Sequence, residues 1–206
     1  MPKLYVAKGA CSLGAHVVLK ELGIAHEIVK VPLRQPDSPI FKVNPLGRVP
    51  TLVTDEGEVI TENAAILPYL ADLKPQAGLI AAAGSVERAR IQEWIGLVNS
   101  DLHPAFRAVN RPNLFHPDEA QFPAVRAQGL TRLRDLLSAI QRRLEGKTWA
   151  VGERFTAADA YLGVFIGWLP RAGIDAAKEY PGLAAYGDRY HARSAVKAAL
   201  ALENTD

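Results

Sequence analysis

The sequence contains one cysteine, Cys11, among its 206 residues. A single thiol excludes an internal disulfide framework and a cysteine-rich zinc or iron–sulfur site, and it is typical of proteins in a reducing compartment. A Cys-x-x-Cys redox pair is excluded as well, because no second cysteine follows three residues later. The protein is therefore predicted to be cytoplasmic.

Motifs for metals and nucleotides are missing too. The five histidines, at positions 16, 26, 103, 116 and 191, show no paired spacing of metal ligands. No Gly-x-Gly-x-x-Gly run occurs, and Gly146-Lys147-Thr148 is not a phosphate loop because Gln141 stands where the first glycine belongs. Neither a metal nor a nucleotide cofactor is expected.

Charge and hydrophobicity give no sign of a nucleic acid or a membrane as partner. The chain has 24 basic and 22 acidic residues, a net charge of +2, and its basic residues are scattered. Its longest apolar stretch, Tyr161–Leu169, is far shorter than the ~20 residues that cross a bilayer. With 49% hydrophobic and 22% charged residues, the composition is that of a folded globular protein.

The first part of the chain alternates between strand and helix patterns in the order βαβ, loop, ββα. The expected strands cover residues 3–7, 26–31, 51–54 and 58–60, and the expected helices cover 15–22 and a segment from 62. Residues 32–50 contain four prolines and are expected to be mostly irregular. The first two strands should pair in parallel, and the last two should form an antiparallel hairpin.

Beyond a linker at 76–85, which is rich in Ala, Gly and Pro, the pattern is helical. Amphipathic stripes run over 91–102 and 125–144, and two shorter helices are expected at 183–192 and 194–202. Thr156 and Asp159 form a capping box before an apolar helix over 160–169, which should be central. We expect an α/β domain over 1–76 and an all-helical domain over 85–206.

Cys11 stands between the first strand and the first helix, in Gly9-Ala10-Cys11-Ser12-Leu13. Free N–H groups and the helix dipole at such a position stabilise a thiolate, although a buried, unreactive thiol is the plain alternative. A hydrolase pair of Cys11 with His103 has little support, because no nucleophile elbow accompanies it.

Two further segments have the chemistry of a binding site. Pro50 stands at the entry to a strand, where its missing N–H is tolerated and a cis bond is possible. Glu62 and Asn63 open a helix whose free N–H groups could hold a ligand carboxylate, although an ordinary helix cap has the same pattern.

Taken in order, these segments resemble the bacterial beta-class glutathione transferases, and the resemblance covers essentially the whole chain. The residues that carry it are Lys3-Leu4-Tyr5, Gly9-Ala10-Cys11-Ser12-Leu13, Asn44-Pro45-x-Gly47-x-Val49-Pro50-x-Leu52, Thr61-Glu62, Glu93-Trp94, Asp101-Leu102-His103 and Arg154-Phe155-Thr156-x-Ala158-Asp159-Ala160.

The resemblance implies a thioredoxin-like N-terminal domain that binds glutathione, an all-α C-terminal domain with a hydrophobic acceptor site, and a homodimer. It implies that the protein conjugates the glutathione thiol to electrophilic hydrophobic substrates, and that Cys11 can also take part in thiol–disulfide exchange. Two alternatives stay open: a non-catalytic protein that binds glutathione or apolar ligands, and a glutathione-dependent disulfide or dehydroascorbate reductase.

The resemblance also assigns residues. Near the sulfur it places Cys11, Ser12 and His103. Val49 would bind the cysteinyl part of glutathione through its backbone, next to a cis Pro50, and Asp101 would reach the γ-glutamyl end across the dimer interface. The full set of expected glutathione contacts is Ala10, Arg34, Arg48, Val49, Pro50, Glu62, Asn63 and Asp101, and the acceptor pocket is Phe106, Tyr161 and Trp168.

Three features depart from the family pattern. Pro104 follows His103 where relatives often have Lys, which removes a cation and is expected to bend the helix. Asn63 replaces a Ser or Gly, although its amide can still bind a carboxylate. The segment 32–42 is short and rich in proline, with Arg34 as the candidate for the lysine that usually contacts the glycyl end.

Overall fold

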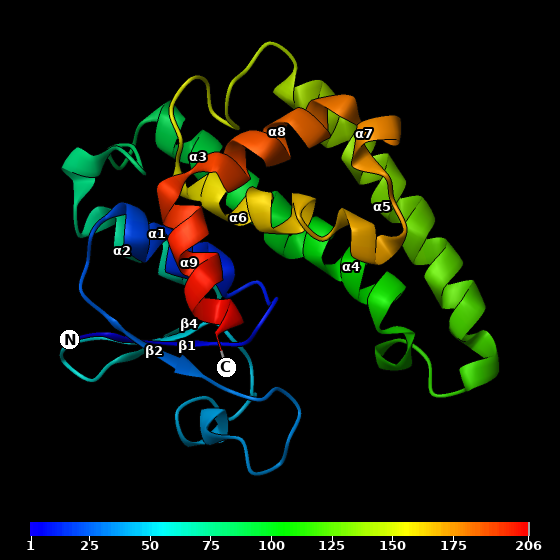
Figure 1. Ribbon diagram of the computed structural model, residues 1–206, viewed down its shortest axis with the longest axis horizontal. Coiled ribbons are helices and arrows are strands. Elements are labelled where there is room, and N and C mark those ends of the chain that lie inside the picture. The colour runs from blue at the N-terminus through cyan, green and yellow to red at the C-terminus, as the bar shows by residue number, and fades with distance from the viewer. Residues whose placement is uncertain (206) are drawn as a thin grey trace.

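A computed structural model of the protein describes residues 1–205. Its N-terminal part is a four-stranded sheet with two helices on one face (Figure 1). The sheet has the order β2-β1-β3-β4, in which β1 is parallel to β2 and β3 is antiparallel to both β1 and β4. The strands are β1 (Lys3–Val6), β2 (Glu27–Lys30), β3 (Thr51–Val53) and β4 (Val59–Thr61). The predicted parallel βαβ unit and the hairpin are confirmed.

The alternation of side chains explains how the sheet is covered. Leu4 and Val6 point toward α1 (Leu13–Glu21) and α2 (Asn63–Asp72) and are fully buried. The opposite face packs against the proline-rich segment, in which η1 (Pro39–Lys42) forms a single 3-10 turn. The segment predicted to be irregular thus covers the second face of the sheet.

The C-terminal part is helical, as predicted, and contains two short helices that lie outside the predicted ranges. Its elements are α3 (Val86–Leu97), a π-helical turn (Val98–Leu102), α4 (His103–Asn110), α5 (Phe122–Leu144), α6 (Ala157–Ile166), α7 (Ala176–Glu179), α8 (Pro181–Ala192) and α9 (Ser194–Asn204). The long α5 runs along the outer side of α4 (Figure 1). One of the two, α4, continues the predicted 91–102 helix beyond the π-helical turn. The other, α7, is only one turn long, too short to show a hydrophobic period.

The central helix of this part is α6, and all ten of its residues are buried. The predicted capping box is confirmed: the Asp159 carboxylate accepts hydrogen bonds from the N–H and the hydroxyl of Thr156, each at 2.8 Å. The helix begins at Ala157, earlier than predicted, because Asp159 is its third residue, the position that a capping box requires. It ends at Ile166, and a 3-10 turn, η6 (Leu169–Ala172), follows.

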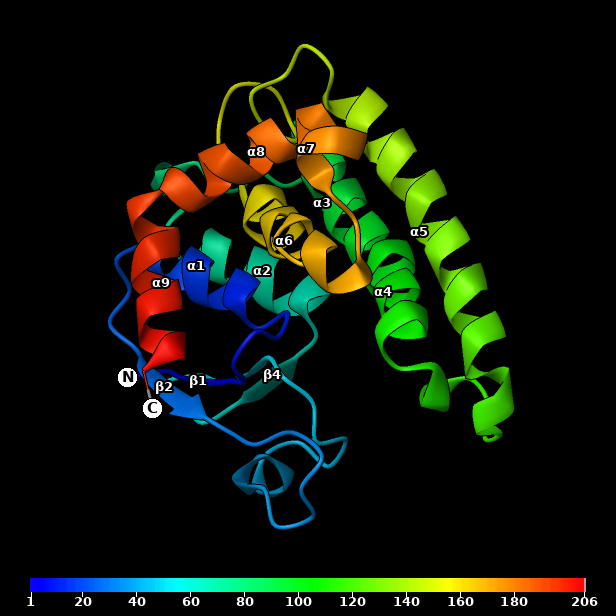
Figure 2. The ribbon, with the colours of Figure 1, turned by 45° about the vertical axis from the view of Figure 1, so that its right-hand side comes forward.

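The last helix returns to the N-terminal part, so that the two ends of the chain lie close together (Figure 2). Arg193 forms a two-pronged ion pair with Glu21 of α1, and Lys30 of β2 donates to the Thr205 carbonyl. The buried hydrophobic core is continuous from Leu4 to Ala199. The fold is a thioredoxin-like domain joined to a helical domain, and the boundary at 76–85 stays a prediction.

Within residues 1–205 no helix is long and apolar enough to cross a membrane. In the same residues no group of three or more His, Cys, Asp or Glu side chains is arranged to hold a metal ion.

Candidate active site

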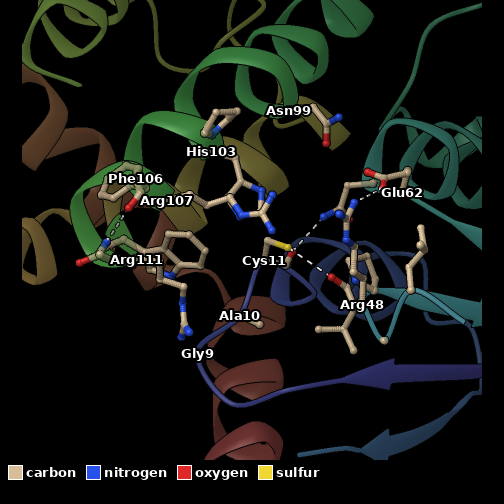
Figure 3. A pocket seen from close by; sticks show the side chains of 18 of the residues that line it. Gly9, Ala10, Cys11, Arg48, Glu62, Asn99, His103, Phe106, Arg107 and Arg111 are labelled. Atoms are coloured by element: carbon tan, nitrogen blue, oxygen red, sulfur yellow. Dashed lines mark hydrogen bonds and ion pairs between the residues drawn. The ribbon is translucent and has the colours of Figure 1, made fainter. Parts of the chain in front are cut away.

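A cleft of about 830 Å³ lies between the two parts of the chain. One wall is built by the loop after β1, the segment that enters β3 and the start of α2, and the other wall by α4, α6 and η6 (Figure 3). Most of the predicted site residues line it, and these are Ala10, Cys11, Arg34, Arg48, Val49, Pro50, Glu62, Asn63, His103, Phe106, Tyr161 and Trp168.

Cys11 lies at the bottom of the cleft, at the turn into α1, with 8% of its surface exposed. Its thiol donates a hydrogen bond to the Val49 carbonyl at 3.5 Å. Burial raises the pKa of the Cys11 thiol to about 12, and a backbone hydrogen bond and the Arg107 charge offset only part of this shift. The sequence left two alternatives open here, a stabilised thiolate and a buried, unreactive thiol. The structure favours the buried, protonated thiol, because the loss of solvation outweighs the backbone hydrogen bond and the Arg107 charge.

The segment before β3 presents backbone groups to the cleft. The Val49–Pro50 bond is cis, as the resemblance implied. Asn44 is buried and shapes this turn, since its side-chain amide donates to the Arg48 carbonyl and to the Thr51 hydroxyl, both at 3.0 Å. These contacts place the polar backbone groups of Val49 beside Cys11.

The start of α2 adds a carboxylate and an amide. Glu62 has a φ of +67°, and Arg34 is the other non-glycine residue of the described chain with a positive φ. Both line the cleft, and backbone strain of this kind is typical of functional sites. Asn63 is 2% exposed and donates to the Cys11 carbonyl at 3.1 Å, but its Oδ1 has no hydrogen-bond partner within residues 1–205. This buried, unpaired amide oxygen belongs to a residue of the cleft wall.

His103 reaches the cleft from the opposite wall, at the junction of the π-helical turn and α4 (Figure 3). Pro104 has no N–H to continue the α-helical ladder, and the preceding turn widens so that the His103 N–H bonds to the Val98 carbonyl. Burial, reinforced by the charges of Arg107 and Arg48, lowers the pKa of His103 to about 4. The imidazole is consequently neutral at pH 7.

Aromatic side chains form the apolar part of the same wall. Phe106 is 1% exposed and meets the ring of Trp168 edge to face, with 5.8 Å between the centroids. Tyr161 is buried beside them, and its hydroxyl donates to Asn99 Oδ1 at 3.2 Å. The predicted acceptor residues therefore lie together.

Two predicted site residues do not line this cleft. Ser12 is fully buried, and its hydroxyl accepts a hydrogen bond at 3.3 Å from the N–H of Ala7, the residue that follows β1. Asp101 accepts a hydrogen bond from Arg132 of α5 at 2.5 Å and lines a separate hollow of about 560 Å³ between α4 and α5. Within one chain neither of them faces Cys11.

Sequence reasoning missed most of the cations around the cleft, which are Lys8, Arg107, Arg111 and Arg171. Arg107 and Arg111 follow His103 at intervals of four residues: His103 and Arg107 share one face of α4, and Arg111 is the residue that follows its C-terminal end. That spacing could have revealed the two arginines. Arg171 has no comparable signal, because it follows α6 in a separate 3-10 turn.

A thioredoxin-like sheet, a helical domain and a cleft that holds a thiol and an imidazole between them define a known class of two-domain protein. The chain belongs to the glutathione S-transferase family. The family model for the N-terminal domain matches residues 9–73, and the model for the C-terminal domain matches residues 103–194. The predicted family and fold class are confirmed.

Within the family, the similarity is to bacterial enzymes. Glutathione S-transferase GST-4.5 of Xanthomonas campestris is 38% identical over 202 residues, which cover 98% of each chain. The beta-class enzyme of Sphingomonas chungbukensis has a similar structure, with a TM-score of 0.89, 37% identity and 98% of each chain covered. A sphingomonad glutathione S-transferase complexed with glutathione has a TM-score of 0.90 and 38% identity, with 99% of this chain and 100% of that chain covered.

Proposed function

We propose that the protein joins the thiol of glutathione to electrophilic carbon atoms of hydrophobic substrates, in the cleft between its two domains. The main support is that one cleft combines a wall of peptide-binding groups with a wall of aromatic rings, and that His103 belongs to the aromatic wall. The comparisons favour neither a non-catalytic binding protein nor a reductase.

The N-terminal wall has groups that match the parts of glutathione. Asn63 Oδ1, buried and unpartnered within residues 1–205, can accept a hydrogen bond from the γ-glutamyl ammonium group, and Glu62 can pair with its charge. The backbone of Val49 is placed to bind a peptide unit. Arg34 lines the same wall and can bind a terminal carboxylate. These contacts would bring the glutathione sulfur toward Cys11.

Positive charge near the sulfur would favour its ionised form. Arg107 already acts to lower the pKa of the buried Cys11 thiol, and a thiolate bound in the cleft would be stabilised by the same charge. His103, which is neutral at pH 7, can accept a hydrogen bond from the thiol, and the proton leaves to solvent, because an imidazole with a pKa of about 4 does not hold it at pH 7. The sulfur then forms a bond to the electrophilic carbon, and the leaving group departs with the electron pair.

Cys11 would serve mainly as a hydrogen-bond donor to that thiolate, because its own pKa of about 12 keeps it protonated. Exchange with oxidised glutathione would form a Cys11–glutathione disulfide and release one reduced glutathione. The raised pKa makes this second reaction slow.

The proposed assembly is a homodimer. Asp101 faces away from the cleft of its own chain, toward the hollow between α4 and α5. It would reach glutathione only in the cleft of a second copy, so the dimer gives this residue a role that a single chain does not. Sedimentation velocity tests the assembly, and a monomer at assay concentrations would overturn this part of the proposal.

The function is tested with glutathione and 1-chloro-2,4-dinitrobenzene as substrates. We expect saturable conjugation, and we expect Asn63→Ala to raise the glutathione KM about tenfold, since a buried hydrogen bond to a charged group is lost. Asn113→Ala is the matched control, because Asn113 is exposed and lies outside the cleft. Glutathione binding without any conjugation would overturn the proposal, and so would faster disulfide exchange than conjugation.

A further inference from the structure

The charge around the cleft is strongly one-sided. Six cationic side chains line it, and Glu62 is its single carboxylate within the described residues. Glu62 stands on the N-terminal wall, 4.0 Å from the nearest nitrogen of Arg48. The cations are Lys8, Arg34 and Arg48 on the N-terminal wall and Arg107, Arg111 and Arg171 on the helical wall.

The three arginines of the helical wall have no ion-pair partner among residues 1–205. Seven other arginines of the same domain do pair with carboxylates, and these are Arg88, Arg90, Arg132, Arg134, Arg143, Arg154 and Arg193, whereas Arg126, Arg142 and Arg189 lie outside the cleft and have no ion pair among residues 1–205. Like charges one helical turn apart, such as Arg107 and Arg111, repel each other. Both stand near the C-terminal end of α4, where the helix dipole offsets part of this cost. That offset does not extend to Arg171, which belongs to η6.

Arg171 is held in place at the cleft. Its Nη1 donates to the Gly9 carbonyl at 2.8 Å, and its guanidinium carbon lies 5.4 Å from the centroid of the Trp168 ring. Gly9 has a φ of +68°, which favours glycine, and a Cβ there would displace the Arg171 guanidinium, whose Nη2 would lie 2.6 Å away. A guanidinium has five N–H donors, and those not used by Gly9 are available to a ligand.

We propose that the helical wall selects electrophiles that carry an anionic group, a carboxylate or a sulfonate, next to an aromatic ring. The ring would pack on Phe106 and Trp168, and the anion would be bound by Arg107, Arg111 and Arg171. Arginine suits this task because its planar fork of donors matches the two oxygens of a carboxylate. The inference rests on the proposed function and adds the class of its second substrate.

The carboxylates of glutathione are the competing explanation for these arginines. The N-terminal wall has three cations of its own, next to the backbone of Val49 and to Asn63, where glutathione is proposed to bind. Arg107 also acts on the Cys11 thiol, but it lines the opposite wall with Arg111 and Arg171, where the aromatic rings are. If an arginine binds only glutathione, substituting it would change the glutathione KM and leave the preference among second substrates unaltered.

The test compares 4-chloro-3-nitrobenzoate with its neutral analogue 4-chloro-3-nitrobenzamide. In both, the glutathione sulfur bonds to the ring carbon that bears chlorine, the carbon–chlorine bond breaks, chloride leaves with the electron pair, and the thiol proton passes to water. The measured quantity is the acid-to-amide ratio of kcat/KM at saturating glutathione, with each rate divided by that of the uncatalysed reaction.

We expect an acid-to-amide ratio of about ten in the wild type. In the double variant Arg107→Gln/Arg111→Gln the ratio should fall about tenfold, since charge-assisted hydrogen bonds to the acid are lost. Raising the salt concentration should lower the wild-type ratio, because ions screen the attraction. Arg126→Gln is the matched control: Arg126 is exposed on α5, away from the cleft, and its loss removes the same charge. Each single variant should give part of the effect.

An unchanged ratio in the double variant would overturn the inference, as would an equal fall in Arg126→Gln or a change confined to the glutathione KM. Binding of the unreactive pair 3-nitrobenzoate and 3-nitrobenzamide, followed through Trp168 fluorescence, tests the same preference without turnover. Neither chlorinated compound being conjugated would overturn the proposed function. If 3-nitrobenzoate still binds more tightly than 3-nitrobenzamide, and this preference depends on Arg107 and Arg111, the anion site is nevertheless supported.

Discussion

At the scale of single residues, the reactive groups of the cleft are uncharged and their neighbours carry the charge. Burial disfavours the charged form of both groups, the Cys11 thiolate anion and the His103 imidazolium cation. At pH 7 it therefore keeps Cys11 protonated and His103 deprotonated. Fixed positive charge comes from arginines, which do not lose their protons in proteins. The cleft therefore keeps the same electrostatic character over a wide range of pH.

Cys11 should react slowly with alkylating reagents in the folded protein. Its pKa of about 12 leaves little thiolate at pH 7.5, so we expect iodoacetamide to modify it on the order of a thousandfold more slowly than in the unfolded chain. Intact mass spectrometry with and without urea measures both rates. Equal rates would show that the thiol is neither buried nor protonated.

His103 should make the protein less stable in acid. Its pKa in the folded protein, about 4, lies below the ordinary value of 6.5. Between pH 6.5 and pH 4 the unfolded chain therefore protonates this histidine and the folded chain does not. Stability is present above pH 6.5 and falls as the pH drops toward 4, and the loss between pH 7.5 and pH 5 is about 2 kcal/mol.

Urea unfolding at these two pH values checks this expectation. In His103→Gln the free energy of unfolding should fall less between pH 7.5 and pH 5, because the contribution of His103 is absent. In His191→Gln, at an exposed position on α8, it should fall as much as in the wild type. The prediction fails if both variants lose as much stability as the wild type.

At the scale of elements, the crossing of α6 and α8 depends on one missing side chain. A Cβ at Gly163 of α6 would lie 2.3 Å from the ring of Tyr190, which is fully buried on α8. By contrast, nothing stands within 4 Å of a Cβ at Gly96 of α3. Glycine weakens both helices, and only at Gly163 does packing require it.

The two glycines should therefore respond to alanine with opposite signs. Gly163→Ala should destabilise the fold by about 1–3 kcal/mol through overpacking against Tyr190. Gly96→Ala should stabilise it by about 0.5–1 kcal/mol, since alanine is the better helix former and restricts the unfolded chain. Urea denaturation of the two variants gives both values, and a stabilising Gly163→Ala would contradict the packing argument.

At the scale of the whole molecule, the two parts of the chain share one hydrophobic core and are joined by polar contacts. The Arg193–Glu21 pair and the contact of Lys30 with Thr205 fasten the C-terminal end to the sheet domain. The cleft lies along this shared boundary, so its shape depends on the two domains staying together.

The domains should consequently unfold together. Trp94, Trp149 and Trp168 all belong to the helical domain, and their fluorescence reports on that domain alone. Hydrogen exchange of β1 and β3 reports on the sheet. We expect the two urea midpoints to coincide, because separating the domains would expose the continuous core. A sheet that opens at lower urea than the tryptophan transition would contradict this.

Much of the fold could be predicted from local patterns. The parallel βαβ unit, the hairpin and the capping box of α6 depend on residues close together in the chain, and all three are confirmed. The burial of Ser12 and the orientation of Asp101 toward the hollow between α4 and α5 could not be predicted. Both depend on which face of an element packs against a distant neighbour.

The sequence by itself determined the family, the order of elements and most of the residues that meet at the cleft, because short motifs and hydrophobic periods specify local structure. Only the tertiary structure decided the protonation of Cys11 and His103 and the gathering of Arg107, Arg111 and Arg171 opposite the sheet. The pKa of a buried group depends on its burial and on its distance from charged groups. Residues far apart in the sequence set both, and they come together only when the two domains pack against each other.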